Sequence, residues 1–334
     1  MNFNIIINTL FHILKYRPSG VIIKNFFKYQ FYSLFPPLIV KYFPISLVVY
    51  LTKRCNFKCN FCFTYDQLNK SDWKDYELSV ADFKKILCSE AGRHCLRIGL
   101  LGGEPFLNKD LFKILDLAHK HRKITTIVTN ASQINSSIKA QLMKSHPTML
   151  GISLYDNNIS EVADLSKWLA LNKIPFWVQT VITADDISKM LAVLDFAKKN
   201  NIKNLILSNY QPSYSKEISK VIYDDNTDFF LLANQVKKIA KTQSINLTLP
   251  NAVQRKTLHR TCKMPFSYIH VDAKGNIGPC CFRPPEEQYG NIFQNNFWNN
   301  KYLITLRSSF LKKNSELLSP CNTCENLSRD LYGI

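Results

Sequence analysis

From position 46 onward, short apolar runs alternate with longer segments in which apolar side chains recur every three or four positions. The short runs are typical of buried β-strands and the longer segments of amphipathic helices. Six repeats of strand and helix predict an α/β fold with a parallel sheet, curved as a partial barrel, whose active site lies at the carboxyl ends of the strands. Strands are predicted at 46–52, 96–101, 124–129, 149–155, 174–183 and 203–209, and helices at 79–91, 108–121, 134–144, 159–172 and 185–199.

Residues 1–45 carry a different pattern, which is helical, apolar and basic, and is broken at Pro18 and Pro36. The first acidic residue of the chain is Asp66. The uncharged runs are too short to span a bilayer. Two interpretations remain open: an amphipathic helical segment that covers the bottom or side of the barrel, or one that lies on an anionic membrane surface.

The C-terminal third is less regular. Residues 211–260 read as a polar connector with one helix at about 228–243. A short strand at 268–272 and a glycine-containing turn at 275–279 then predict a small hairpin. The predicted units are 1–45, 46–210, 211–260 and 261–334.

Composition limits the classes of molecule that the protein is expected to bind. The net charge is +18, but the lysines are spread along the chain without a basic recognition helix, so we expect anionic substrates or lipid rather than nucleic acid. The N-terminus has no early basic cluster followed by a small-residue cleavage site, so we expect a cytoplasmic protein, on the inner membrane face if residues 1–45 bind lipid. In that compartment, metal ligation is a better use of ten cysteines than disulfides.

Seven of the ten cysteines fall into two groups with ligand spacing; Cys88 and Cys95 lie apart as core or surface thiols. The first group, Cys55-Asn-Phe-Lys-Cys59-Asn-Phe-Cys62, directly follows the strand at 46–52. Three thiolates in a tight loop can hold three corners of a 4Fe–4S cube and leave the fourth iron open for a chelating substrate. The alternatives are a partial zinc knuckle, or thiols that merely lie near each other.

The three-cysteine loop resembles the signature of the radical S-adenosylmethionine (SAM) superfamily, and Gly102-Gly103-Glu104-Pro105 after the second strand resembles its glycine-rich motif. The resemblance implies a partial (β/α)6, TIM-like barrel. It also implies that SAM chelates the open iron and is cleaved to a 5′-deoxyadenosyl radical, with Glu104 accepting from the methionyl amine. Relatives often have glycine where Ala131 stands, and an aspartate where Tyr155 stands. The implied SAM contacts are Phe61, Gly102, Gly103, Glu104, Pro105, Asn130, Ser153 and Gln179. Asp156 stands one position after that of the relatives' aspartate.

The C-terminal cysteines resemble the cluster-binding extension called SPASM, in its shortened, twitch-type form. The resemblance implies one auxiliary 4Fe–4S cluster, although zinc could also occupy four thiolates. The implied ligands are Cys262, Cys280, Cys321 and Cys324. Cys281, adjacent to a ligand, is expected to point elsewhere.

The resemblance therefore implies a radical SAM enzyme of the oxidoreductase type with two 4Fe–4S clusters. We expect a small-molecule substrate, such as a sugar or a lipid-linked compound, and an electron donor such as flavodoxin or ferredoxin. Two alternatives stay open: a peptide-modifying maturase, and a non-catalytic iron–sulfur protein on the same scaffold. The intact cysteine loop and Glu104 count against the last.

Overall fold

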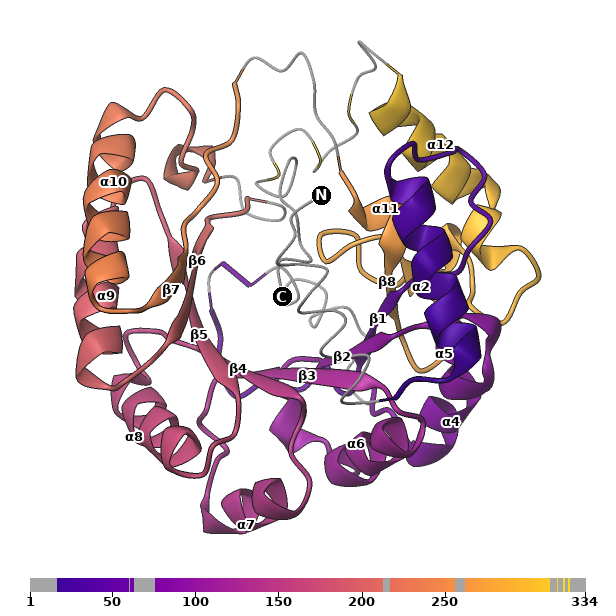
Figure 1. Cartoon of the computed structure of the whole chain (residues 1–334), viewed down its shortest axis with the longest axis horizontal. Coiled ribbons are helices and arrows are strands. Elements are labelled where there is room, and N and C mark those ends of the chain that lie inside the picture. Colours follow the sequence, from indigo (N-terminus) through magenta and orange to yellow (C-terminus); the bar gives the residue numbers. More distant parts are fainter. Residues whose placement is uncertain are drawn as a thin grey trace.

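One curved sheet organises the computed structural model, which describes residues 17–59, 61–62, 76–212, 217–255, 262–312, 317, 321 and 324. Within these residues the sheet has nine strands in the order β7-β6-β5-β4-β3-β2-β1-β8-β9, and only β9 runs antiparallel to its neighbour. Helices cover its outer face (Figure 1). The strands are β1 Ser46–Tyr50, β2 Arg97–Leu101, β3 Ile124–Thr129, β4 Met149–Ser153, β5 Phe176–Ile182, β6 Asn204–Asn209, β7 Asn246–Thr248, β8 Tyr268–Val271 and β9 Ile277–Gly278.

The helices follow the predicted alternation, with one division. The stretch predicted as a single helix at 79–91 forms two, because Ser89 takes an extended conformation and its hydroxyl caps the second helix by accepting from Gly92 N. The α-helices are α2 Gly20–Ser33, α4 Val80–Cys88, α5 Glu90–His94, α6 Leu111–Lys120, α7 Ser136–Lys144, α8 Ile159–Leu171, α9 Lys189–Lys199, α10 Thr227–Thr242, α11 Met264–Ser267 and α12 Lys301–Leu311. Short 3₁₀ helices are η2 Pro105–Leu107, η3 Ile218–Lys220, η4 Glu287–Tyr289 and η5 Phe297–Asn299.

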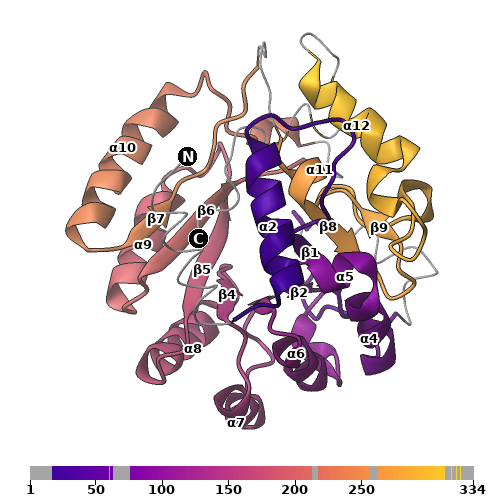
Figure 2. The same ribbon diagram turned by 45° about the vertical axis from the view of Figure 1, so that its right-hand side comes forward.

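The sheet extends beyond the six predicted strands at both ends. β7, which lies in the segment expected to be a connector, pairs in parallel with β6. β8 pairs in parallel with β1, which brings the C-terminal segment alongside the first strand (Figure 2). The sequence Asn-Leu-Thr of β7 is too short to show a strand pattern, so this strand was missed.

Alternation along the strands separates two faces. Leu47, Val49 and Leu51 point into the core shared with the helices. Val48 and Tyr50 point to the concave side, where Val48 meets Gly99 of β2. The concave side is therefore a lumen lined by alternate residues of each strand, with a mouth at the carboxyl ends.

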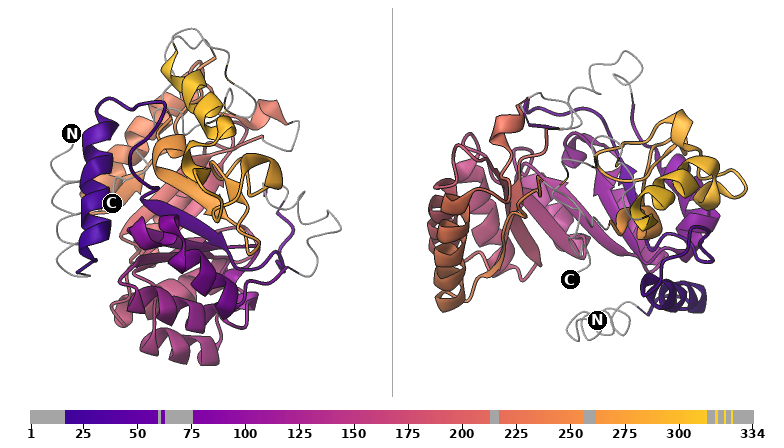
Figure 3. Two further views of the ribbon diagram at one scale, coloured as in Figure 1. Left: turned by 90° about the vertical axis from the view of Figure 1, so that its right-hand side faces the viewer. Right: turned by 90° about the horizontal axis from the view of Figure 1, so that it is seen from above.

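Residues 17–45 cross the end of the barrel opposite the mouth, where the strands begin. Ile22 of α2 packs with Leu96 and Ile124, which lie at the amino-terminal ends of β2 and β3. Figure 3 shows α2 at the outer margin of the molecule. None of the described helices has the length and hydropathy needed to cross a membrane. Residues 1–16, which belong to the predicted amphipathic segment, lie outside the described residues.

Candidate functional site

The cysteine loop starts where β1 ends and rests on the two glycines that follow β2. Gly103 N donates to Thr52 O over 2.8 Å, and Glu104 N donates to Arg54 O over 2.8 Å. A Cβ atom on Gly102 would lie 2.5 Å from Thr52 O, and one on Gly103 would overlap Arg54 O. These glycines thus permit a close approach of the protein's own backbone at Thr52 and Arg54.

A charged clamp fixes the chain just before Cys55. Arg54 Nε donates to Glu77 Oε1 over 2.6 Å, and Arg54 Nη2 donates to Leu107 O over 2.7 Å. Thr52 Oγ1 also donates to Glu77 Oε1, and Asn108 Nδ2 donates to Glu77 Oε2, each over 2.8 Å. Glu77 therefore joins β1, η2 and the cysteine loop, a role that no motif in the sequence indicated.

The thiols of Cys55, Cys59 and Cys62 lie close enough together to repel one another as thiolates. Burial, followed by the neighbouring Cys62 and Cys55, raises the pKa of Cys59 to about 11. Three such groups fit a cation that would neutralise them. Among the described residues no group of His, Cys, Asp or Glu is placed to hold a single metal ion. A cube binds each thiolate at a different iron, whereas a zinc knuckle binds its thiolates at one ion.

Glu104 is buried at the base of this loop, beside Cys55. Its Oε1 accepts from Thr129 Oγ1 over 2.8 Å and from Phe106 N over 3.2 Å, and its Oε2 accepts from Asn130 N over 2.8 Å. Burial raises the pKa of this carboxyl. A carboxylate oxygen accepts two hydrogen bonds, so Oε2 retains one position for a further donor. Glu104 thus ties η2 to the end of β3 and can still receive an ammonium group.

Asn130 lies between Glu104 and the cysteine loop. Its Nδ2 donates to Asn56 Oδ1 over 3.1 Å, Asn56 Nδ2 donates to Ser132 Oγ over 2.8 Å, and Ser132 Oγ donates to Asn130 Oδ1 over 2.5 Å. This closed triangle fastens the loop to the turn after β3. The turn includes Ala131 at φ +66°, a left-handed conformation that glycine adopts without strain.

The strands β4 and β5 contribute a second polar patch. Gln179 Nε2 donates to Ser153 Oγ over 3.5 Å, and Trp177 Nε1 donates to Gln179 Oε1 over 2.8 Å. Ser153 and Gln179 therefore lie together on the lumen side. Asp156 lies apart, exposed and paired with Lys189 Nζ at 2.8 Å.

Tyr155 is a site residue that the sequence analysis passed over. Its ring centroid lies 5.5 Å from that of Phe61 and 6.0 Å from that of Phe57. Its hydroxyl hydrogen-bonds Cys59 and Ser153. It links the cysteine loop to β4. The available signal was its place two residues after Ser153, where relatives commonly have aspartate.

Further down the lumen, aromatic rings and one cation line the wall. His270 lies between Tyr50 and Tyr268, with ring centroids 5.4 and 5.1 Å away, and its Nδ1 is 3.2 Å from the Tyr50 hydroxyl. Burial lowers the pKa of His270 to about 3, so the imidazole is neutral. Arg97 of β2 donates to Thr126 Oγ1 over 3.3 Å. Tyr50 and His270 are buried, so the rings of this wall pack against one another.

The second cysteine group gathers between α11, β9 and the C-terminal end of the described chain. Cys280 and Cys321 lie near Cys262, whose pKa is raised mainly by burial. Burial and the nearby Cys321 raise the pKa of Cys280 to about 12. Cys324 N donates to Cys321 O over 3.4 Å. Cys281 and Cys280 both lie near Tyr268. The structure thus brings together Cys262, Cys280 and Cys321, three of the four predicted ligands, and Cys324 follows Cys321 by three positions.

A buried arginine supports this second group. Arg307 of α12 is fully buried, and its guanidinium donates to Pro265 O at 2.9 Å, Trp298 O at 2.8 Å and Asn299 Oδ1 at 2.9 Å. Its charge lies 4.6 Å from the Trp298 ring. Arg307 therefore joins α12 to α11, which follows Cys262 directly.

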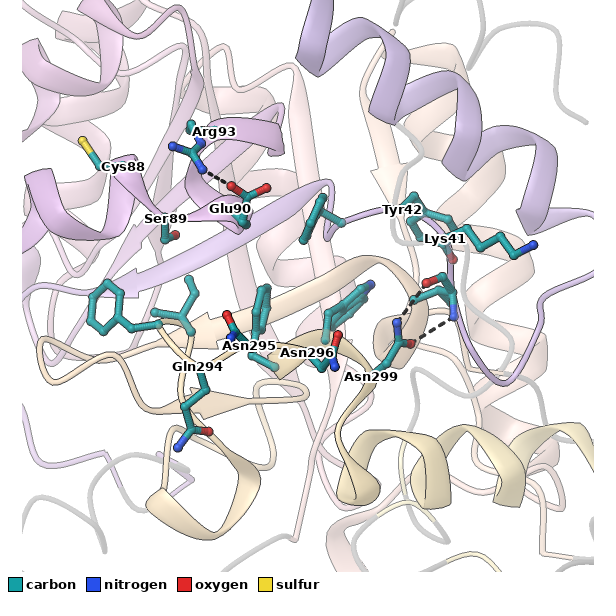
Figure 4. Close-up of a pocket in the computed structure, with 16 residues that line it drawn as sticks. Lys41, Tyr42, Cys88, Ser89, Glu90, Arg93, Gln294, Asn295, Asn296 and Asn299 are labelled. Carbon is teal, nitrogen blue, oxygen red and sulfur yellow. Dashed lines mark hydrogen bonds and ion pairs between the residues drawn. The ribbon is translucent and has the colours of Figure 1, made fainter.

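One cavity lies away from both cysteine groups. It has a volume of about 450 Å³ and is lined by residues 40–43, 88–90, 93 and 292–299 (Figure 4). Asn299 closes one end through paired hydrogen bonds with the Val40 backbone, both of 3.0 Å. No predicted site residue lines it, so it is separate from the candidate site.

Comparison with known proteins yields two family models that match the chain. The radical SAM superfamily model covers residues 49–217, about half of the chain, and an iron–sulfur cluster-binding domain model, SPASM, covers residues 262–325. A cysteine-type anaerobic sulfatase-maturating enzyme from Clostridium perfringens is 22% identical over 325 residues, covering 84% of this chain and 86% of that protein. A PqqA peptide cyclase from Granulibacter bethesdensis is 26% identical over 116 residues, covering 35% of this chain and 30% of that protein.

Solved structures show the same fold. Streptococcus suis SuiB bound to precursor peptide SuiA superposes with a TM-score of 0.64 at 22% identity, covering 91% of this chain and 73% of that chain. The structure of anSMEcpe with bound AdoMet gives a TM-score of 0.62 at 17% identity, covering 85% of this chain and 84% of that chain. At these identities the likeness establishes the architecture of the barrel and its extension.

Proposed function

The chain belongs to the radical SAM superfamily, and on that premise we propose that it is a peptide-modifying enzyme. Its class, its use of SAM and a 4Fe–4S cluster, and its SPASM iron–sulfur domain follow from the family. The substrate is the proposed part. The relatives named above act on a sulfatase, on the peptide PqqA and on the precursor peptide SuiA. These relatives favour the peptide alternative over the small-molecule substrate that the sequence analysis expected.

The observation that carries the proposal is that the cysteine loop and Glu104 lie together at the carboxyl edge of the sheet. Cys55, Cys59 and Cys62 would hold the SAM-binding cluster, and the Oε2 atom of Glu104 would accept from the methionyl ammonium. When bound, the reduced cluster and SAM supply a 5′-deoxyadenosyl radical that takes a hydrogen atom from the substrate. The closed triangle of Asn56, Asn130 and Ser132 keeps the loop in place.

The lumen below the loop would receive the residue to be modified. Gln179, half-buried beside Ser153, offers a polar contact near the cysteine loop, and the half-buried Tyr268 offers apolar surface further down. Phe61 and Tyr155 together form an aromatic wall next to Cys59 that would exclude water. A peptide side chain that enters such a lumen leaves its backbone at the mouth.

The C-terminal thiols would hold one auxiliary cluster, with Cys262, Cys280, Cys321 and Cys324 as ligands. Four thiolates leave no open position for SAM, so this group would act on the substrate after hydrogen abstraction or would shape the mouth. An electron donor such as flavodoxin or ferredoxin would reduce the SAM-binding cluster.

The test uses the full chain, reconstituted without oxygen and incubated with SAM and a strong reductant. Synthetic peptides encoded by short open reading frames beside the gene are compared with sugars and nucleotides as substrates. We expect one peptide to raise 5′-deoxyadenosine formation above the rate with SAM alone and to change mass, and the Cys59→Ala variant to do neither. Stimulation by a small molecule, with none by any peptide, would overturn the peptide proposal.

A further inference from the structure

We propose that α2 and the turn after it form a lipid-binding ridge that seats the protein on an anionic membrane surface, with the mouth of the barrel turned away from the lipid. The ridge consists of Phe27, Phe31, Leu34, Phe35 and Ile39. This inference concerns a surface remote from the cysteine loop and is independent of the proposed substrate.

The fold uses only one narrow face of α2. Its buried residues are Ile22, Asn25 and Tyr29. Asn25 Nδ2 donates to Phe43 O over 3.0 Å and to His94 O over 3.2 Å, and Asn25 Oδ1 accepts from Phe43 N over 2.8 Å. Tyr29 packs edge-on against Tyr42, with ring centroids 5.5 Å apart. These contacts fix the helix on the barrel without help from its opposite face.

The opposite face is apolar and exposed. The exposed fraction of the ridge residues runs from 56% at Phe27 to 86% at Phe35. Phe27 and Phe31 lie one turn apart on α2, Leu34 and Phe35 directly follow its last residue, Ser33, and Ile39 comes after the turn. Large apolar side chains at such exposure do nothing for the packing of the barrel, and five of them within thirteen positions indicate an interaction site.

The charges beside the ridge identify the partner. Lys24, Lys28 and Lys41 are exposed, and the sequence has no acidic residue before Asp66. Lys28, Arg93 and Lys123 all lie near enough to His94 to lower its pKa, after the larger effect of burial. Long lysine side chains can lie along apolar surface and place their charge at the level of lipid headgroups.

A second copy of the chain fits this surface poorly, because joining two ridges would bring lysines against lysines. A neutral protein partner would leave the lysines without counter-charges. Anionic lipid supplies both an apolar layer for the phenylalanines and negative headgroups for the lysines. The helix α2 itself lies at the outer margin of the molecule (Figure 3).

The position of α2 determines how the barrel is oriented on the membrane surface. Ile22 lies over the amino-terminal ends of β2 and β3, whereas the cysteine loop leaves the carboxyl end of β1. With the ridge on lipid, the mouth faces the aqueous phase. Substrate would then enter from solution, which does not favour a lipid-linked substrate.

Cosedimentation of the full chain with vesicles tests the ridge. We expect binding to vesicles of phosphatidylcholine with phosphatidylglycerol, little binding to phosphatidylcholine alone, and weakening with added salt. The triple variant Phe27→Ser, Phe31→Ser, Phe35→Ser and the double variant Lys24→Glu, Lys28→Glu should each weaken binding at least about tenfold.

The matched control replaces Leu171 of α8 and Leu231 of α10, which are 82% and 71% exposed, with serine. This control should bind vesicles as the unaltered chain does. The serine triple variant should keep the melting temperature and the SAM cleavage rate, which separates lost lipid binding from lost folding. Unchanged vesicle binding in the triple variant would overturn the proposal. So would a dimer of the unaltered chain, in analytical ultracentrifugation, that the triple variant converts to monomer.

Discussion

The two cysteine groups are held in place by different kinds of interaction. The first is fastened by side-chain networks that reach across three strand ends, through Glu77, Glu104 and Asn130. The second depends on Arg307, a buried cation that is satisfied mainly by backbone carbonyls. The first group is thus built into the sheet edge, whereas the second depends on how three separate segments pack. This difference predicts that the two groups can be disabled independently.

The largest expected effect separates the groups by role. Cys59→Ala should abolish reductive cleavage of SAM, because the open cluster loses a ligand, while Cys280→Ala should leave cleavage measurable. Each variant should lose about half of the roughly eight irons in the reconstituted protein. Iron content and 5′-deoxyadenosine formation are the measurements. Loss of cleavage in both variants, in soluble protein, would mean that the groups are not separable.

The second-largest effect is a loss of stability when the backbone packing under the first cysteine group is disturbed. Gly103→Ala should lower the free energy of unfolding by about 3 kcal/mol, because the new methyl group overlaps Arg54 O and the loop must shift. Gly20→Ala, where no atom lies within 4 Å of the added carbon, serves as the control and should be close to neutral. Chemical denaturation measures both. If Gly103→Ala were as stable as Gly20→Ala, the loop would be able to shift at little cost, and the contacts of Arg54 would not hold it in place.

Arg307 gives the corresponding test of the second group. Arg307→Met should cost about 2 kcal/mol, because Pro265 O and Trp298 O are left buried without donors. The variant should lose iron from the second group and retain SAM cleavage. Retention of all iron in a destabilised variant would show that α12 is not needed to place Cys262.

The ionisation of Glu104 gives a smaller, pH-dependent effect. Burial holds its folded pKa above the ordinary value of 4.5. Its contribution to stability is therefore fully present below pH 4.5 and is lost as the pH rises through the folded pKa. Glu104→Gln cannot titrate, so the destabilisation it causes should be greatest near pH 4.5 and smaller at pH 8. The free energies of unfolding of both proteins across this range provide the measurement, and a difference independent of pH would contradict the prediction.

The smallest effect lies within the triangle on the cysteine loop. Asn56→Ala, Asn130→Ala and the double variant form a cycle whose coupling energy should be about 1 kcal/mol, the scale of one neutral hydrogen bond. Additive costs would show that Asn56 and Asn130 act separately, and would weaken the contrast between the two cysteine groups.

The sequence by itself determined the local features. Strand and helix periods predicted six parallel strands, and the spacing of the cysteines and of Gly102-Gly103-Glu104-Pro105 indicated the cofactor chemistry before any contact was known. These signals are local, because a loop that holds a cluster needs its ligands close together in the chain. The family match supports that prediction over residues 49–217.

The tertiary structure decided what depends on segments far apart in the chain. It placed β8 beside β1, 222 positions apart in their register, brought Tyr155 to Cys59, and gave Glu104 its partners on β3. It also turned Phe27, Phe31 and Phe35 outward, which the helical pattern left open. Period and spacing specify which face of an element is apolar, but only the packing of that element decides whether the face meets the core, a partner or solvent.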